Sequence, residues 1–126
     1  MADAVVTKIA RNKMLRARAG EIPLPKIIGF AFGDGGVDDS GNVLTPSEDQ
    51  EELHSELLRK EIDSYTMISE TKCKYECTLE NEELEGESIS EMALYDADGD
   101  LVAIKNCMPK GKDNDFEMKF EIVDCF

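Results

Sequence analysis

Two apolar runs joined by a short polar turn form the most apolar stretch of the chain, Ile89–Asn106. The runs are Ile89–Tyr95 and Leu101–Ile104, and Asp98-Gly99 lies at the centre of the turn. Asp-Gly between apolar runs predicts a β-hairpin, because a type I′ turn needs a positive φ at both central residues. Neither run alternates cleanly, so both faces of the hairpin carry apolar side chains. The hairpin should therefore lie centrally in a sheet or contact a partner.

Two other segments, Lys72–Leu79 and Phe116–Val123, alternate cleanly between apolar and polar positions. This pattern predicts half-buried strands of an antiparallel sheet with one solvated face. The side chains expected to face the core are Cys73, Tyr75, Cys77 and Leu79, and Phe116, Met118, Phe120 and Ile122. A shorter strand is predicted over Lys26–Phe32. It leads into Gly33-Asp34-Gly35-Gly36, whose glycines we interpret as backbone freedom at the start of a long loop, since the spacing of a phosphate-binding loop is missing.

Two segments have the spacing of helices. Residues 4–19 carry a narrow, alanine-rich apolar stripe, and Gly20 is well placed to end this helix. Ser47 begins a second predicted helix, because Ser47 and Gln50 have the spacing of a capping box and acidic residues fill the first turn. The fold class predicted is α+β in a single domain, residues 1–126. An N-terminal helix and a second helix pack against a mainly antiparallel sheet of about four to five strands.

The net charge of −14 argues against nucleic acid and anionic membranes as partners. The charge is uneven, because residues 1–27 carry a net +4 and the remainder −18. A basic end on an acidic body could dock onto a neighbouring protein, or it could be a solvated helix. We find no transmembrane run and no secretory signal, and four cysteines without a disulfide or zinc pattern fit reducing cytosol.

The turn residues Asp96, Asp98 and Asp100 suggest a calcium site. An EF-hand is rejected, because its twelfth position, counted from Asp96, is Cys107 and the flanking segments are predicted strands. An irregular calcium site in a calcium-dependent binding module remains an alternative. A hairpin turn rich in Asp and Gly is the simpler interpretation.

Catalytic chemistry has little support in the sequence. The single histidine, His54, has no assignable nucleophile or carboxylate partner, and Cys73 and Cys77 are expected to pack in the core. We therefore predict no catalytic, cofactor-binding or metal-binding residues, and a protein that is not an enzyme. A small cytosolic enzyme is the least favoured alternative.

Several short segments, taken in order, resemble the N-terminal domain of phage tail-collar fibre proteins. The first is Ile27–Gly35, a strand ending in Gly-Asp-Gly, and the second is Leu53–Ile62. The best-marked segment has a Glu, then Leu-Tyr-Asp, a glycine turn and a second apolar strand. It is matched here by Glu91, Leu94-Tyr95-Asp96, Gly99 and Leu101-Val102-Ala103.

The resemblance implies a non-enzymatic structural protein of a phage or prophage-derived tail, a tail fibre or baseplate attachment component. Its expected partners are other tail or baseplate proteins, and a homo-oligomer is implied, possibly a trimer, since tail fibres are commonly trimeric. It would be made in the cytoplasm of the bacterial host and assembled into a virion or tail-like particle. A full fibre continues into a shaft and a receptor-binding tip, whereas this sequence ends at Phe126, so we expect the attachment end.

Overall fold

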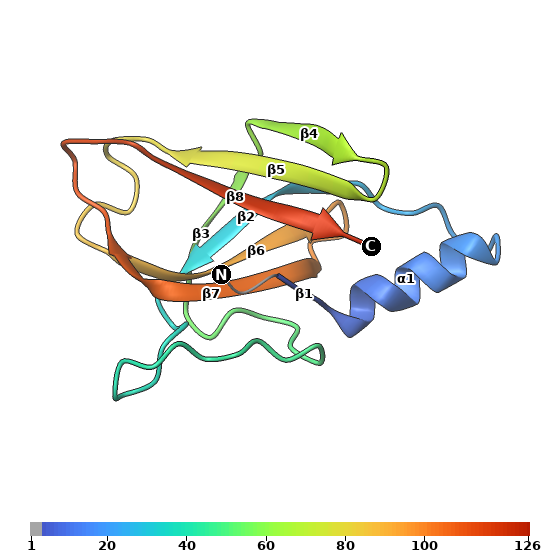
Figure 1. The fold of residues 1–126 in the computed structure, drawn as a ribbon, viewed down its shortest axis with the longest axis horizontal. Coiled ribbons are helices and arrows are strands. Elements are labelled where there is room, and N and C mark those ends of the chain that lie inside the picture. The colour runs from blue at the N-terminus through green and yellow to red at the C-terminus, as the bar shows by residue number, and fades with distance from the viewer. Residues whose placement is uncertain (1–3) are drawn as a thin grey trace.

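Two antiparallel sheets packed face to face make up most of the structure, a computed structural model that describes residues 4–126 (Figure 1). The five-stranded sheet has the order β1 (Val5–Val6), β7 (Leu101–Gly111), β6 (Ser88–Asp96), β2 (Ile27–Gly33) and β3 (Glu56–Glu61). The three-stranded sheet has the order β4 (Ser64–Ser69), β5 (Lys72–Leu79) and β8 (Met118–Cys125). The helix α1 (Lys8–Arg18) extends from one end of the two sheets.

The main core lies between the two sheets. Phe30 and Phe32 of β2 stack, and the Phe32 ring meets that of Phe120 on β8 with 5.1 Å between centroids. Alternate residues of β5 and β8 supply the opposite wall, among them Cys77 and Ile122, which are fully buried. The period-two patterns of these strands therefore predicted the inward faces correctly, although β8 begins at Met118 and leaves Phe116 exposed.

The apolar hairpin β6–β7 is central, as its two-sided pattern predicted. β6 pairs with β2 on one side and β7 on the other. One face of this sheet meets the three-stranded sheet. On the other face Ala31, Ala93 and Ile104 form a second buried cluster with Leu53, which lies on the long loop crossing this face (Figure 1). A sheet and a loop therefore cover the hairpin, rather than helices.

The predicted α+β fold with a second helix is wrong. The segment that begins at Ser47 forms turns and then enters β3, so the described chain is mostly strand with one short helix. Ser47 caps a single turn, in which its hydroxyl accepts from the Asp49 N–H and its carbonyl accepts from the Gln50 N–H. The chain then extends because β3 pairs with β2 in an antiparallel ladder, which local helix signals do not outweigh.

The first helix is shorter than predicted, because Val5 and Val6 pair with β7 as the strand β1. Thr7 caps the helix, since its hydroxyl accepts from the Ala10 N–H and donates to the Leu101 carbonyl at 2.7 Å. Gly20 ends it with a φ of +82°, as the sequence predicted. The pattern also missed β3 and β4, which bring the described strands to eight.

Replacing Ile104 with Ala tests whether the second apolar face is part of the core. Because Ile104 is fully buried against the loop, we expect a loss of about 2 to 4 kcal/mol in the free energy of unfolding. Urea denaturation measures this loss. Leu15→Ala is the control, since Leu15 is 62% exposed and should change stability by less than about 0.5 kcal/mol. Normal stability with impaired assembly would instead assign Ile104 to an interface with another protein.

Candidate functional site

A buried carboxylate on β6 joins the central hairpin to the long loop. Glu91 is fully buried, yet its two carboxylate oxygens accept three backbone N–H bonds. Oε2 accepts from Gly35 and Ser55, both at 2.8 Å, and Oε1 accepts from His54 at 2.9 Å. Burying a charge is costly unless such bonds satisfy it, so this carboxylate fixes both ends of the loop against the sheet.

The glycines of the Gly-Asp-Gly-Gly segment make room for this carboxylate. A Cβ on Gly33 or Gly35 would lie 2.6 or 2.8 Å from Glu91 Oε2. A Cβ on Gly36 would meet the Ser90 carbonyl oxygen, and the Gly36 N–H donates to the Ser90 hydroxyl at 2.8 Å. None of these three glycines has a positive φ. Our interpretation of backbone freedom is therefore wrong, because close approach is what requires glycine here.

The aspartates of the β6–β7 turn surround a lysine from α1. Lys13 Nζ lies 2.8 Å from Asp96 Oδ2, 3.0 Å from Asp98 Oδ2 and 2.7 Å from Asp100 Oδ2. The Lys13 side chain is only 12% exposed, and Asp96 is 3% exposed. Asp96 also accepts the Asp98 and Asp100 N–H bonds through Oδ1, which shapes the turn around the ammonium group. We call these four residues the Lys13 cluster.

The turn that presents the three aspartates is not of type I′. Only Gly99 in it has a positive φ, of +87°. Its N–H donates to the Asp96 carbonyl at 2.9 Å, and the Asp96 N–H donates to the Asp100 carbonyl. This is the longer hairpin loop in which a tight turn is followed by a left-handed glycine. The extra length lets Asp96, Asp98 and Asp100 converge on one point.

The ammonium group of Lys13 holds the place that a cation would take among these carboxylates. Its burial lowers the pKa of Lys13, but the hydrogen bonds that it donates to Asp100, Asp96 and Asp98 outweigh this, so the pKa lies above its ordinary value. A raised lysine pKa keeps the stabilising charge at every pH below the ordinary lysine range. The carboxylate oxygens lie within 4.8 Å of one another, which is also a spacing suitable for a metal ion.

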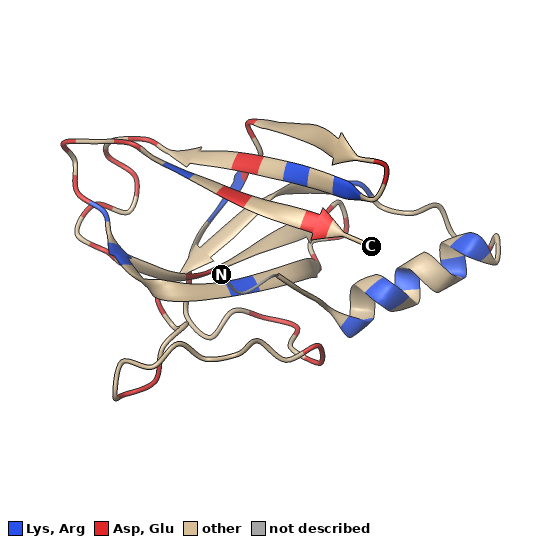
Figure 2. Ribbon diagram, in the orientation of Figure 1, with Lys and Arg blue, Asp and Glu red and all other residues tan. Residues whose placement is uncertain are grey.

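Other basic residues of α1 also pair within the chain. Arg11 binds Glu48 at 3.1 Å, and Lys8 lies 3.6 Å from Asp49. Figure 2 shows the basic residues along α1, whose N-terminal end lies beside an acidic loop of the body. The charge asymmetry between the N-terminal segment and the rest thus helps to dock α1 on its own body.

A groove of about 820 Å³ opens between the two sheets at the end where α1 lies. Its walls include Met14 of α1, Ile27 of β2, and Tyr65 and Met67 of β4. Asp124 of β8 also lines it, with a buried Oδ1 that has no hydrogen-bond partner. Burial raises the pKa of Asp124 above its ordinary value. The groove is therefore mainly apolar, and Asp124 places in its wall a poorly solvated carboxylate without an ion-pair partner among the described residues.

A family model described as phage tail-collar fibre protein, N-terminal, matches residues 1–120. The chain belongs to this family. The resemblance identified from the sequence is thereby confirmed, and it gives the chain a structural role in a phage tail, assembled into the virion with other tail components. Comparison with curated proteins and with solved structures finds no match. No helix among the described residues is long and apolar enough to cross a membrane.

In this member of the family, the segments that carried the resemblance meet at one point. Ile27–Gly35 ends beside Glu91, which begins the best-marked segment, and Leu53–Ile62 supplies the His54 and Ser55 N–H groups. Sequence reasoning missed the role of Glu91. A charged residue inside an apolar run, between Ser90 and Met92, was the available signal, because such a residue needs buried partners.

The remaining candidates have structural contacts. The His54 ring Nδ1 lies 3.0 Å from the Gly35 carbonyl oxygen, beside the Glu91 bonds. Cys77 is fully buried, and burial raises the pKa of its thiol to about 12, which keeps it protonated and unreactive. Cys73 is half-buried in the groove wall.

Glu91→Gln tests the carboxylate that joins the loop to the sheet. The amide group brings an N–H₂ where an oxygen accepts backbone N–H bonds, so at least one buried donor loses its partner. We expect a loss of about 2 to 3 kcal/mol in the free energy of unfolding, measured by urea denaturation. Faster amide exchange at Gly35, His54 and Ser55 should accompany this loss. The exposed Glu82→Gln is the control, and equal stability of the two variants would contradict the assigned role.

Lys13→Met tests whether the ammonium group replaces a metal ion. Removing one partner of a largely buried charge cluster should cost about 2 kcal/mol, reduced from the fully buried case because Asp98 and Asp100 are partly exposed. Millimolar calcium should then raise the melting temperature of Lys13→Met while leaving that of the original chain unchanged. Titration calorimetry provides the second readout. Calcium binding by the original chain would support the alternative of a calcium-dependent module.

Proposed function

We propose that this chain is a non-enzymatic attachment domain, residues 1–126, which joins a tail fibre or baseplate component to neighbouring proteins of a phage or prophage-derived tail. The family match over residues 1–120 carries this proposal. The proposed partners are other tail or baseplate proteins. A homo-oligomer, with a trimer as the first expectation, is part of the same proposal.

Two charged groups that bind segments distant in sequence support a mechanical rather than a catalytic role. The Glu91 carboxylate binds backbone N–H groups and the Lys13 ammonium group neutralises three aspartates. Each of these groups holds segments distant in sequence together: the loop to β6, and α1 to the β6–β7 turn. Such links suit a domain that must keep its shape while other proteins attach to it.

The calcium-dependent module is the second candidate, because the three turn aspartates converge closely enough to hold an ion. Lys13 already supplies the positive charge there, which favours the attachment domain. The calcium titration of Lys13→Met and of the original chain separates the two candidates.

Deletion of the gene in the phage or prophage tests the attachment role. We expect tails that lack the fibre or baseplate component when viewed by electron microscopy, and no loss of DNA packaging. The original gene and Glu82→Gln should restore complete tails, whereas Glu91→Gln should restore fewer because its loop is loosened. Complete and infectious particles without the gene would contradict the proposal.

Light scattering over a concentration series tests the oligomer and the partners. The chain alone should give the mass of a homo-oligomer, and addition of the neighbouring tail proteins should give a heavier complex. A strict monomer that binds none of them would count against both parts of the proposal.

A further inference from the structure

The edge strand β4 differs from the other sheet edges of the described chain. β1 has only two residues, β3 carries Glu56, Arg59, Lys60 and Glu61, and β8 carries Lys119, Glu121 and Asp124. Short length and charged side chains are the usual means by which proteins prevent a free edge from pairing with another strand. β4 reads Ser-Tyr-Thr-Met-Ile-Ser, without charge or proline. This edge therefore lacks the usual side-chain protection.

Every residue of β4 is exposed, although it is part of a regular ladder. Within residues 4–126 it pairs with β5 on one side and forms the end of its sheet on the other. Tyr65, Met67 and Ile68 are 64%, 60% and 50% exposed. A register shift between Met67 and Ser69 interrupts the far end of the strand, so Ser64–Met67 is the regular part. Alternate residues of this part direct their backbone N–H and C=O groups to the free edge, where an added strand would pair.

The exposed side chains of β4 continue into the apolar groove. Tyr65 and Met67 line it together with Leu24 and Phe126, which are 57% and 72% exposed. Tyr65 lies opposite Tyr75 in the ladder, and their ring centroids are 6.2 Å apart. A strand added beside β4 would place alternate side chains next to Tyr65 and Met67, at the mouth of this groove. Backbone pairing and apolar burial would thus act together.

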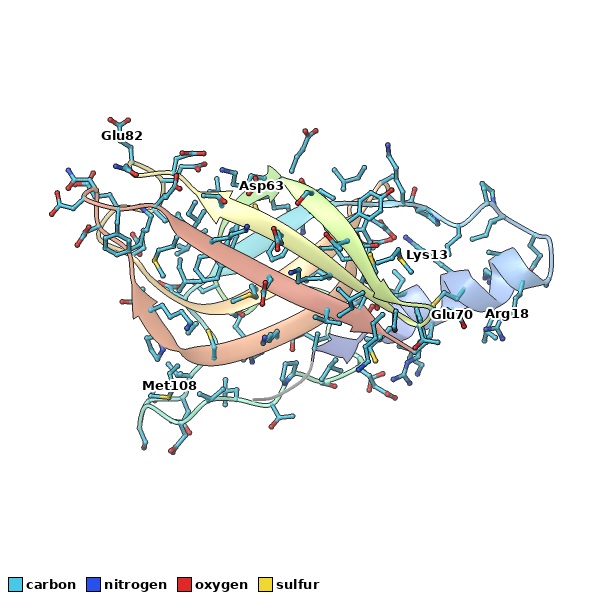
Figure 3. All side chains as sticks on the ribbon, turned by 45° about the horizontal axis from the view of Figure 1, so that its top comes forward. Lys13, Arg18, Asp63, Glu70, Glu82 and Met108 are labelled. Carbon is cyan, nitrogen blue, oxygen red and sulfur yellow. The ribbon has the colours of Figure 1, made fainter. Side chains whose placement is uncertain are left out.

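The charges around β4 indicate the chemistry of the strand that it would accept. Asp63 and Glu70 flank β4, and Figure 3 shows them at its two ends. The nearby lysines, Lys72 and Lys74, lie on β5, on the side of β4 away from the free edge. The chain as a whole carries −14. Opposite charges across a pair of strands stabilise the pair, and like charges opposite each other destabilise it. An incoming strand with Lys or Arg at both ends therefore complements this edge.

We propose that β4 is a docking edge for a strand of another protein, uncharged and β-prone in its centre and basic at both ends, which extends the three-stranded sheet. This inference deepens the attachment role proposed above and rests on it. The strand would gain backbone hydrogen bonds from Ser64–Met67, and its alternate side chains would enter the mouth of the groove. Its basic ends would lie next to Asp63 and Glu70.

A second copy of this chain is a poorer occupant. If β4 paired with β4 of another copy, acidic ends would meet acidic ends in both the parallel and the antiparallel arrangement. This local repulsion opposes self-pairing at this edge, so a homo-oligomer should use another surface.

A synthetic peptide of alternating Val and Thr with one Lys at each end provides the probe. We expect it to bind the full chain, and amide exchange followed by NMR should show protection in β4 rather than in β3 or β8. The same peptide with Glu at both ends should bind about three- to tenfold more weakly, and salt should reduce this difference. Methylating one alternate set of peptide N–H groups should abolish binding, and methylating the other set should not, since only one set faces β4.

Three variants locate the site. Met67→Lys should weaken binding of the Lys-ended peptide strongly, whereas Met108→Lys should not, although the two methionines are 60% and 62% exposed. Glu70→Lys should weaken the Lys-ended peptide and strengthen the Glu-ended one, which a misfolded variant would not do. Binding unaffected by Met67→Lys, or protection confined to another strand, would overturn the proposal.

Self-association is measured on the same variants. If Met67→Lys dissociated a homo-oligomer of the free chain, β4 would be an interface between copies and the proposal would be wrong. If the peptide failed to bind, the gene-deletion result would still stand. Incomplete tails without peptide binding would therefore retain the attachment role and reject only the β4 docking edge.

Discussion

The buried carboxylate of Glu91 is the constraint on which the arrangement of the central sheet depends. A fully buried charge must be satisfied within the protein, and three backbone N–H groups from both ends of the loop do this. The loop is therefore held across the outer face of β6, where Leu53 covers Ala93 and Ile104. The need for space beside the carboxylate in turn requires glycine at positions 33 and 35. One side chain thus determines the path of a segment that has no regular structure of its own.

The Lys13 cluster applies the same principle to the helix. Apart from Ala10, the described residues of α1 are not fully buried, so apolar packing alone holds it weakly. Two directional contacts supplement this packing. The Lys13 ammonium group binds the aspartates of the β6–β7 turn, and the Thr7 hydroxyl donates to the Leu101 carbonyl of β7. The basic residues of α1, which the sequence alone could assign to an external partner, instead bind acidic residues of the same chain.

The elements that the sequence predicted correctly are those whose own side-chain pattern reflects which of their faces are buried. β5 and β8 alternate because one face meets Phe32 and its neighbours, and the hairpin is apolar on both faces because both are covered. The second helix was wrongly predicted because Ser47 and Gln50 give the signals of a helix start but form one turn. The deciding contacts come from Glu91, some 40 residues away, and from β2. Neither contact produces an alternating sequence pattern near Ser47. The strand β3 was missed for the same reason.

The acidic charge of the chain limits the self-pairing to which the uncharged edge strand β4 is prone. An uncharged edge strand invites pairing with any chain, and most sheet edges here avoid this by charge or short length. β4 instead lies between Asp63 and Glu70 on a chain with a net charge of −14. Repulsion between copies then provides the protection that the strand itself lacks, and it does so without excluding a basic partner. The same charge that keeps identical chains apart at this edge therefore selects the strand that can pair with it.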